Sequence, residues 1–536
     1  MAKKGPTVRL QTINRKSGNN QHFINVPQKL LQQTELDKDA EFIWQVNASG
    51  GLSLRSKCSS LEETEKSCGI PLLDEFWKCW ESCRPAFNSE KQWENAGMIA
   101  IGEVLNTERH TLSQALTSTG LGACDWNQFY RLFTKRRLNI DALEKALLLQ
   151  LLQELSPDAP VVLLVDDTQL RKSGKKIPGT KWLRDKLGPK FNVNLIWGQR
   201  FLQVSLAIPS REGGCRSYPI TFLHCPILKK IGKKATVQQQ REYKDKLKQM
   251  TLPIVAAEKL KGIVAQLAGR NVEIVGDGGF TNSKFVRNLP DGCEYLGRAR
   301  KDAKLFALPE TCNTGRGRPT FYGERLPTPT EIYKDESIPL KTVAIMLSGK
   351  EHKYRVKEQI VRSPIFGDRD LRIIIVAPVY YIRGCVRGHR DPMFLVTTDL
   401  KTPIEKLLEH YIWRWEIELN FKDEKSVFGI NEPQVWNADA VEKRSPFIAL
   451  VYSMFMLACH RTFQENNPIT YAKWRNPEKI RRASARDYRE LFRKAVALIA
   501  PADAENKSGF DGASLLKTNL FLFIALQKER RLTMIS

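Results

Sequence analysis

The stretch VVLLVDDT, residues 161–168, decides the fold of this chain. Its first five residues are Val or Leu, which is typical of a strand that is buried on both faces. A second run of this kind, VEIVGD at 272–277, follows a helical segment at 252–269. Buried strands that alternate with helices indicate an α/β fold. We therefore expect a mixed sheet whose strand ends carry Asp166 or Asp167 and, on the second strand, Asp277.

Further elements are expected on both sides of these strands. Residues 195–209, LIWGQRFLQVSLAIP, are interpreted as a hairpin, and residues 341–399 are expected to hold several strands. Residues 92–155 are predicted to be helical, and so is the basic region after about residue 465. Within the first of these regions, a helix at 107–117, a Gly turn and a helix at 126–133 fit either a helix-turn-helix or a plain bundle.

The charge of the chain points to a polyanionic partner. The 536 residues include 84 Lys and Arg against 59 Asp and Glu, a net charge of +25 that is spread along the whole sequence. An excess of this size and distribution favours nucleic acid as the partner. The eleven cysteines include no CxxC pair, which favours free thiols in a reducing cytoplasm. The longest apolar run, 446–459, is too short to span a bilayer, so we expect a core helix and no membrane.

One predicted helix, residues 404–428, carries a narrow charged stripe. At about 100° per residue, Tyr411, Arg414, Glu418 and Lys425 fall within about 60° of one another. Charges on a buried helix cost free energy unless they meet a metal, a phosphate or one another. The stripe is therefore a candidate active site, and the alternative is a buried Arg–Glu pair. Most of the other face is apolar and expected in the core: Ile412, Trp413, Trp415, Ile417, Leu419 and Phe421.

Three carboxylates lie on or at the end of buried elements: one of the Asp166–Asp167 pair, Asp277 and Glu418. Carboxylates brought together repel one another unless divalent cations hold them. Two such cations can activate a water and stabilise the leaving oxygen of a phosphodiester. The sequence therefore predicts a metal-dependent phosphoryl-transfer enzyme that acts on DNA. The alternative for any single aspartate is that it caps a helix or orders a loop.

These motifs together resemble the DDE transposases of bacterial insertion sequences, in the group with the signature Tyr-x2-Arg-x3-Glu-x6-Lys. The four stripe residues match that spacing, LLVDDT resembles the first family motif, and VGDGGFTN at 275–282 resembles the second. The segment YLGRARKDAKLF, the RGRP loop and the strands up to residue 398 resemble the β-rich insertion of this group. The resemblance covers roughly residues 90–465.

The resemblance implies an RNase H-like core in which Asp166, Asp277 and Glu418 bind two Mg²⁺ ions, with Mn²⁺ able to substitute. Asp166 is preferred over Asp167 because adjacent strand residues face opposite sides and because the core pattern is Asp-x-Thr/Ser. By the same resemblance, Tyr411, Arg414 and Lys425 contact DNA phosphates. The Gly residues after Asp277 depart from the Asp-Arg-Glu-Ala form of the second motif, which leaves a hairpin or another cleavage intermediate open.

The implied activity is cut-and-paste transposition, in which the protein cleaves the ends of its insertion sequence and transfers them into target DNA. The implied partners are the terminal inverted repeats and the target DNA, bound by a dimer at the bacterial nucleoid in the cytoplasm. Two alternatives are an inactive or domesticated DNA-binding relative and an RNase H-like cellular nuclease. Arg316 and Arg318, within Arg-Gly-Arg-Pro, fit either an AT-hook for the minor groove or a flexible basic turn.

The expected organisation is an α/β chain with helical regions at both sides of an interrupted core. Residues 21–55 resemble the swapped-hairpin DNA-binding domains of the AbrB-like regulators, and a generic small β-rich unit is the alternative. The expected segments are 1–57, a β-rich DNA-binding unit; 58–155, a helical domain for the transposon end; 156–290, the first part of the RNase H-like core; 291–400, the β-rich insertion; 401–465, the second part of the core with the Glu helix; and 466–536, a helical basic region.

Overall fold

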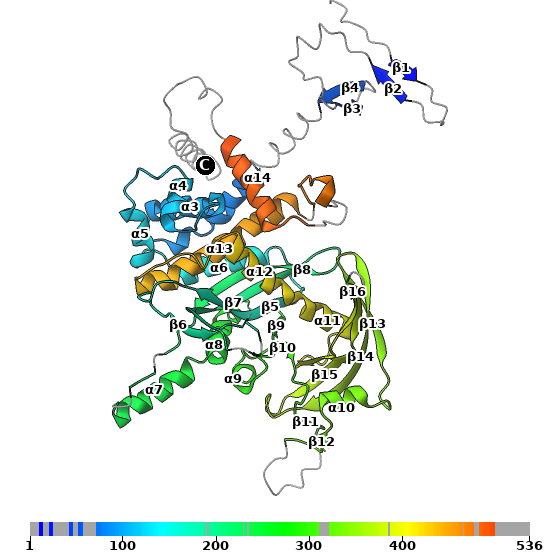
Figure 1. Cartoon of the computed structure of the whole chain (residues 1–536). Coiled ribbons are helices and arrows are strands. Elements are labelled where there is room, and N and C mark those ends of the chain that lie inside the picture. The colour runs from blue at the N-terminus through cyan, green and yellow to red at the C-terminus, as the bar shows by residue number, and fades with distance from the viewer. Residues whose placement is uncertain are drawn as a thin grey trace, which may run out of the picture. The chain divides into compact units, whose positions relative to one another are not determined.

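The computed structural model describes residues 71–498 with short gaps, together with the backbone of four strands nearer the N-terminus (Figure 1). The chain divides into two compact units, Met1–Cys68 and Gly69–Ser536. The gaps are residues 187, 190, 192, 229, 233–234, 268, 310–320, 384–385, 465 and 476–481.

The first unit contains two antiparallel strand pairs. β1 (Leu10–Ile13) pairs with β2 (Gln21–Ile24), and β3 (Phe42–Val46) pairs with β4 (Leu52–Ser56). Strands β2, β3 and β4 lie within residues 21–55, where a β-rich unit was expected, and β1 lies before that range. Residues 25–41 lie outside the described residues, and the resemblance to swapped-hairpin domains stays a prediction.

Five strands in the order β8–β7–β5–β9–β10 form the centre of the second unit. β9 runs parallel to both β5 and β10, whereas β7 is antiparallel to β5 and β8 is antiparallel to β7. This mixed sheet confirms the expected α/β, RNase H-like core. The bounds are β5 (Val161–Arg171), β7 (Leu195–Pro209), β8 (Cys215–His224), β9 (Val272–Gly276) and β10 (Cys293–Arg298).

Residues 195–209 form one long strand, β7, so the expectation of a hairpin there is wrong. The first part of β7 pairs with the short strand β6 (Lys181–Arg184), and its second part pairs with β8. Gly198 lies inside the strand, and a Cβ atom there would come within 2.4 Å of the Leu170 carbonyl oxygen. The glycine therefore permits β7 to approach β5 closely and does not mark a turn.

The β-rich insertion continues the core sheet. β18 (Met393–Thr397) is antiparallel to both β10 and β15 (Asp370–Val376), so core and insertion share one twelve-stranded sheet. Within the range expected for the insertion, β10 belongs to the core because it pairs in parallel with β9. The other elements are β11 (Leu305–Phe306), β12 (Arg325–Leu326), α10 (Pro329–Lys334), β13 (Lys341–Leu347), β14 (Lys350–Arg362), β16 (Val379–Arg383) and β17 (Val386–Arg390).

Helices cover both faces of the central sheet. In Figure 1, α6, α12 and α13 lie on one side of the core strands, and α8 and α9 lie on the other. The helices of this part are one at residues 71–81, α3 (Glu90–Leu105), α4 (Leu112–Ser118), α5 (Asn127–Thr134), α6 (Ile140–Leu152), α7 (Val237–Gln249), α8 (Leu252–Val264), α9 (Ser283–Val286), α11 (Ile404–Trp413), α12 (Trp415–Ser426), α13 (Ala438–Phe463) and α14 (Ala485–Leu498), with 3-10 turns at Arg84–Ala86 and Lys473–Arg475.

Helix α13 is the central helix of the N-terminal and C-terminal helical regions. Among the described residues it is the one helix long and apolar enough to cross a membrane, but 83% of its apolar window is buried inside the protein. Its Arg444 is buried and forms an ion pair with the fully buried Glu103 of α3. Residues from 71 to about 155 therefore pack onto α13 within the same compact unit as the core. α4 begins at Leu112, capped by Thr111, and not at Thr107.

Candidate active site

Strand β5 directs Asp166 and Asp167 to opposite faces of the sheet. Val162 and Leu164 pack in the hydrophobic cluster that also contains residues of α11 and α12. Side chains alternate along a strand, so Asp166 faces α11 and α12 as well. Asp167 pairs with Lys186, whose Nζ lies 2.6 Å from its Oδ1. The geometry therefore agrees with the preference for Asp166 over Asp167.

Asp277 lies beside Asp166 at the carboxyl end of the neighbouring strand. The parallel register pairs Val165 with Gly276, so the residue after each is an aspartate at the same edge of the sheet. The Oδ1 atom of Asp277 accepts the backbone N–H groups of Gly279 at 2.8 Å and Phe280 at 3.3 Å. The Gly278–Gly279 turn therefore holds this carboxylate in place.

The charged stripe lies on two helices and not on one. α11 and α12 meet at Arg414, where 3-10-type hydrogen bonds, Arg414 N–H to Tyr411 C=O at 3.3 Å and Ile417 N–H to Arg414 C=O at 3.2 Å, tighten the turn. The expectation that Trp413 and Trp415 both pack in the core is wrong: Trp413 is buried, but Trp415 is 59% exposed. Residues two apart on a helix point about 200° apart, so only one can face the sheet.

Arg414 connects the helices to the strand ends. Its Nη2 donates to Glu418 Oε1 at 2.9 Å, its Nη1 lies 3.6 Å from Asp166 Oδ2, and its guanidinium lies 5.9 Å from the ring centre of Tyr411. Its Nε is buried and has no hydrogen-bond partner among the described residues. One donor of Arg414 therefore has no protein partner within the described part of the chain.

Lys425 contacts the same face of β5, at the residue two positions after Asp166. Its Nζ donates to Thr168 Oγ1 at 2.7 Å, and Thr168 faces the helices because it lies two residues after Asp166. Burial lowers the pKa of Lys425, and the nearby Lys186 lowers it further. The structure thus brings Asp166, Asp277, Tyr411, Arg414, Glu418 and Lys425 into one region.

The electrostatics of the two aspartates fit a divalent cation. Burial and the charge of Asp277 raise the pKa of Asp166 to about 7, while Arg414 opposes the shift. A cation between the carboxylates would remove that repulsion. Within the described residues, no group of three or more His, Cys, Asp or Glu is gathered closely enough to hold a metal. Glu418 instead turns towards Arg414.

A buried pair that the sequence analysis did not identify joins α11 to β9. His410 Nδ1 lies 2.5 Å from Glu273 Oε2, and both side chains are buried. Glu273, Val275 and Asp277 alternate on β9, so they point to the helix side together. That alternation, applied to VEIVGD, was the signal in the sequence that could have identified Glu273. The partner on α11 could not be identified because it depends on tertiary packing.

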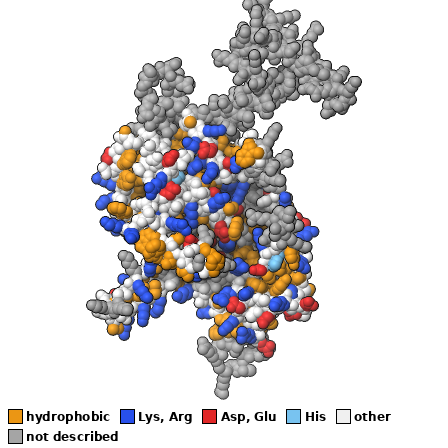
Figure 2. Space-filling model, in the orientation of Figure 1, with side chains coloured by type: hydrophobic (Ala, Val, Ile, Leu, Met, Phe, Trp, Pro, Cys, Tyr) orange, Lys and Arg blue, Asp and Glu red, His pale blue; other side chains and the backbone are white. Residues whose placement is uncertain are grey.

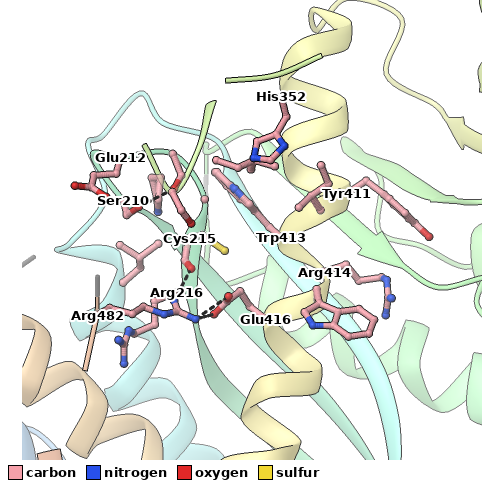
Figure 3. Close-up of a pocket in the computed structure, with 18 of the residues that line it drawn as sticks. Ser210, Glu212, Cys215, Arg216, His352, Tyr411, Trp413, Arg414, Glu416 and Arg482 are labelled. Carbon is pink, nitrogen blue, oxygen red and sulfur yellow. Dashed lines mark hydrogen bonds and ion pairs between the residues drawn. The ribbon is translucent and has the colours of Figure 1, made fainter. Parts of the chain in front are cut away.

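A groove of about 1180 Å³ opens beside Tyr411 and Arg414 (Figure 3). Its walls are the β7–β8 turn, the β13–β14 turn, the α11–α12 junction and the end of α13 with the start of α14. Arg482 crosses the groove floor, where it pairs with Glu416 at 2.9 Å and donates to the Cys215 carbonyl at 3.0 Å. Basic lining residues outnumber acidic ones: Arg216, Arg298, Lys350, Arg390, Arg414 and Arg482 against Glu212, Asp391 and Glu416.

Arg316 and Arg318 fall outside the described residues, so the AT-hook stays a prediction. Cys79 and Cys83 are buried in the helical region, and burial raises the pKa of Cys79 to about 12. A thiol with that pKa is protonated at neutral pH.

Comparison with known proteins identifies the family. Residues 83–360, just over half of the chain, match the family described as DDE superfamily endonuclease. A search of curated proteins found no match. The matched range contains Asp166 and Asp277, and proteins of this superfamily are nucleases that generally use divalent metal ions. With its RNase H-like core and its paired strand-end aspartates, this chain belongs to the DDE superfamily endonucleases.

Proposed function

We propose that this endonuclease is the transposase of a bacterial insertion sequence, which cleaves the ends of its element and joins them to target DNA. The observation that carries the proposal is the meeting of Asp166 and Asp277 with the Tyr411–Arg414–Glu418–Lys425 stripe beside a basic groove. A nuclease needs carboxylates for metal ions and cations for phosphates within one site. Both are supplied here by elements far apart in the sequence.

In this proposal Asp166, Asp277 and Glu418 hold two Mg²⁺ ions, with Mn²⁺ as a substitute. Bound there, the metal ions supply an activated water or hydroxyl and stabilise the leaving oxygen. Glu418 is 36% exposed at its side chain and is held by Arg414. A DNA phosphate that takes the donors of Arg414 would release Glu418 towards the aspartates. Substrate binding would then complete the ligand set.

The basic side chains would hold the DNA strand. Arg414 would offer the planar fork of its guanidinium to a phosphate, and Lys425 would offer a point charge. Tyr411, partly stacked under Arg414, presents a phenol whose burial raises its pKa, so it stays a hydrogen-bond donor. The groove beside them, with its excess of Arg and Lys, suits the strand that leads into the site.

The proposal also covers partners. Terminal inverted repeats and target DNA are the substrates, and a dimer would cut two ends together at the bacterial nucleoid. Two alternatives from other classes are a DNA-binding relative without catalysis and an RNase H-like nuclease of the cell. The complete carboxylate set favours catalysis over the first, and the large insertion that extends the sheet favours a transposase over the second.

The test uses the DNA that flanks the gene. The full-length protein is incubated with a duplex that carries the terminal repeat, with Mg²⁺ or EDTA, as wild type and as Glu418→Ala. We expect nicking at the repeat boundary that needs both Mg²⁺ and Glu418, followed by strand transfer when target DNA is added. Binding without cutting would support the non-catalytic relative. Cutting of branched DNA without strand transfer would support the cellular nuclease.

A further inference from the structure

The segment between β8 and α8 concentrates positive charge outside the candidate active site. We define the basic arm as residues 228–249, which comprise α7 and its approach. It contains eight Lys and Arg against two Asp and Glu, a net charge of +6 out of +25 for the whole chain. That is about a quarter of the net charge on 22 of the 536 residues. Figure 2 shows Lys and Arg side chains gathered where α7 projects from the body.

Helix α7 has little contact with the rest of the protein. All its residues are described and none is buried; even Val237 and Leu247 are 67% and 43% exposed. The next helix, α8, has the same length and buries Ala256, Ala257 and Leu260. An isolated helix of thirteen residues is marginally stable in water because tertiary packing supplies most helical stability. A helix of this kind gains stability when a partner binds it.

The charges of α7 are arranged on one side. At about 100° per residue, Arg241, Lys244 and Lys248 fall within about 60° of one another, and Lys246 points the opposite way. Lys248 also lies 3.4 Å from Asp245, an exposed pair of the kind that contributes little. The three residues span about 10 Å along the helix axis, close to the rise of three base pairs. We call these three residues the arm stripe.

The arm starts near the candidate active site. Lys181 at the start of β6 donates to the Leu228 carbonyl at 3.0 Å, and Lys186 just after β6 pairs with Asp167. The six residues from 181 to 186 span about 17 Å if the chain is extended. The start of the arm thus lies within about 17 Å, or about 5 base pairs, of Lys186, and the length of α7 adds about 20 Å. The arm can therefore reach DNA duplex about 5 to 11 base pairs from the site.

We propose that the arm stripe binds the phosphates of the DNA duplex that runs away from the cleavage position, independently of base sequence. The proposal rests on the proposed function only for the choice of DNA as partner. Evenly spaced cations on one face of an exposed helix fit the regular phosphates of a duplex. The two large apolar side chains exposed on α7, Val237 and Leu247, lie ten residues apart and form no continuous apolar surface for a protein partner.

The test measures binding of the full-length protein, as a function of salt, to a 40-base-pair duplex that contains the terminal repeat and to a short duplex that ends less than about 5 base pairs from the cleavage position. Arg241→Gln, Lys244→Gln and Lys248→Gln are combined, since Gln keeps helix propensity. Each lost phosphate contact makes the negative slope of log K against log salt shallower by about 0.9. On the long duplex, the slope of the triple variant should therefore be about 2.7 shallower than that of the wild type. The loss should shrink on the short duplex.

A matched pair of single variants controls for total charge. Lys244→Gln lies on the stripe and should lower the slope by about 0.9, whereas Lys246→Gln on the opposite face should leave it unchanged. Thermal unfolding should be the same for all variants because no residue of α7 is buried. Equal effects of Lys244→Gln and Lys246→Gln, or a triple variant with the wild-type slope, would overturn the proposal. If the stripe variants change the slope as expected but the wild-type protein does not cleave DNA, the proposed function is wrong and the binding role of the arm stripe still holds.

Discussion

Helices α11 and α12 carry a charged stripe at helical spacing, and so does α7, but the two stripes lie in different surroundings. The first faces the sheet, where Arg414 pairs with Asp166 and Glu418 and Lys425 donates to Thr168. The second faces solvent on a helix without a buried residue. In the stripe on α11 and α12, burial shifts the pKa values, and each charge depends on its partners. In the stripe on α7, each charge acts through long-range electrostatic attraction. The same pattern therefore predicts chemistry in one place and binding in the other.

The largest expected effect is on the rate of DNA cleavage, and it should differ between the two aspartates of β5. Asp166→Asn removes a carboxylate on the helix side and should lower the rate of DNA cleavage about a thousand-fold or more. Asp167→Asn is the matched control, because Asp167 faces away and pairs with exposed Lys186, and it should retain most of the activity. Cleavage rates on the terminal-repeat duplex measure both. A larger loss from Asp167→Asn than from Asp166→Asn would assign the site to the other face of β5.

The next effect concerns a buried carboxyl of α12 for which α7 has no counterpart. Glu424 is fully buried, and burial raises its pKa to about 8 from an ordinary 4.5. The folded state therefore holds a proton that the unfolded chain releases, and this contribution to stability is lost as pH rises towards and through 8. Glu424→Gln should be more stable than wild type at pH 9, by up to about 4 kcal/mol, and close to it at pH 4.5.

Thermal midpoints across pH would measure this difference, with Glu242→Gln on exposed α7 as the control that should match wild type at both pH values. Lys425 and Asp423 are the charged neighbours of Glu424, the first lowering and the second raising its pKa. A Glu424→Gln variant that is less stable than wild type at pH 9 would show that the folded protein holds this carboxylate charged.

Truncating one apolar side chain on α12 and one on α7 should show how differently packing stabilises the two helices. Ile417 of α12 is fully buried in the core cluster, so Ile417→Ala should lower the free energy of unfolding by about 2–5 kcal/mol. Leu247 of α7 is 43% exposed, so Leu247→Ala should change it by less than about 0.5 kcal/mol. Chemical denaturation monitored by Trp fluorescence would compare them. Equal losses would show that α7 packs against something in solution.

The smallest effect is the response to metal without DNA. A divalent cation between Asp166 and Asp277 relieves their repulsion, so saturating Mg²⁺ should raise the stability of the wild type by about 1–3 kcal/mol. Asp166→Asn should lose most of that response, and variants of the arm stripe should keep it. Thermal unfolding with Mg²⁺ and with EDTA is the measurement. An Asp166→Asn variant that Mg²⁺ stabilises as much as wild type would place the cation elsewhere.

Several features could be read from the sequence because they are local. Buried strands show as apolar runs, so VVLLVDDT and VEIVGD predicted the core strands and the aspartates at their ends. The spacing of Tyr411, Arg414, Glu418 and Lys425 predicted one helical face. Errors arose where local pattern and tertiary contact disagree: residues 195–209 form one strand, and the site helix is interrupted at Arg414, which leaves Trp415 exposed.

The sequence by itself determined the α/β class, the basic character and the residues of the candidate site, because alternation, helical period and charge are properties of neighbouring residues. Only the tertiary structure decided which residues meet. The parallel register of β5 and β9 brings Asp166 and Asp277 together across more than a hundred residues, and the packing of α11 pairs His410 with Glu273. It also decided that α12 is held against the sheet while α7 stands free, since burial depends on the whole fold and not on the helix.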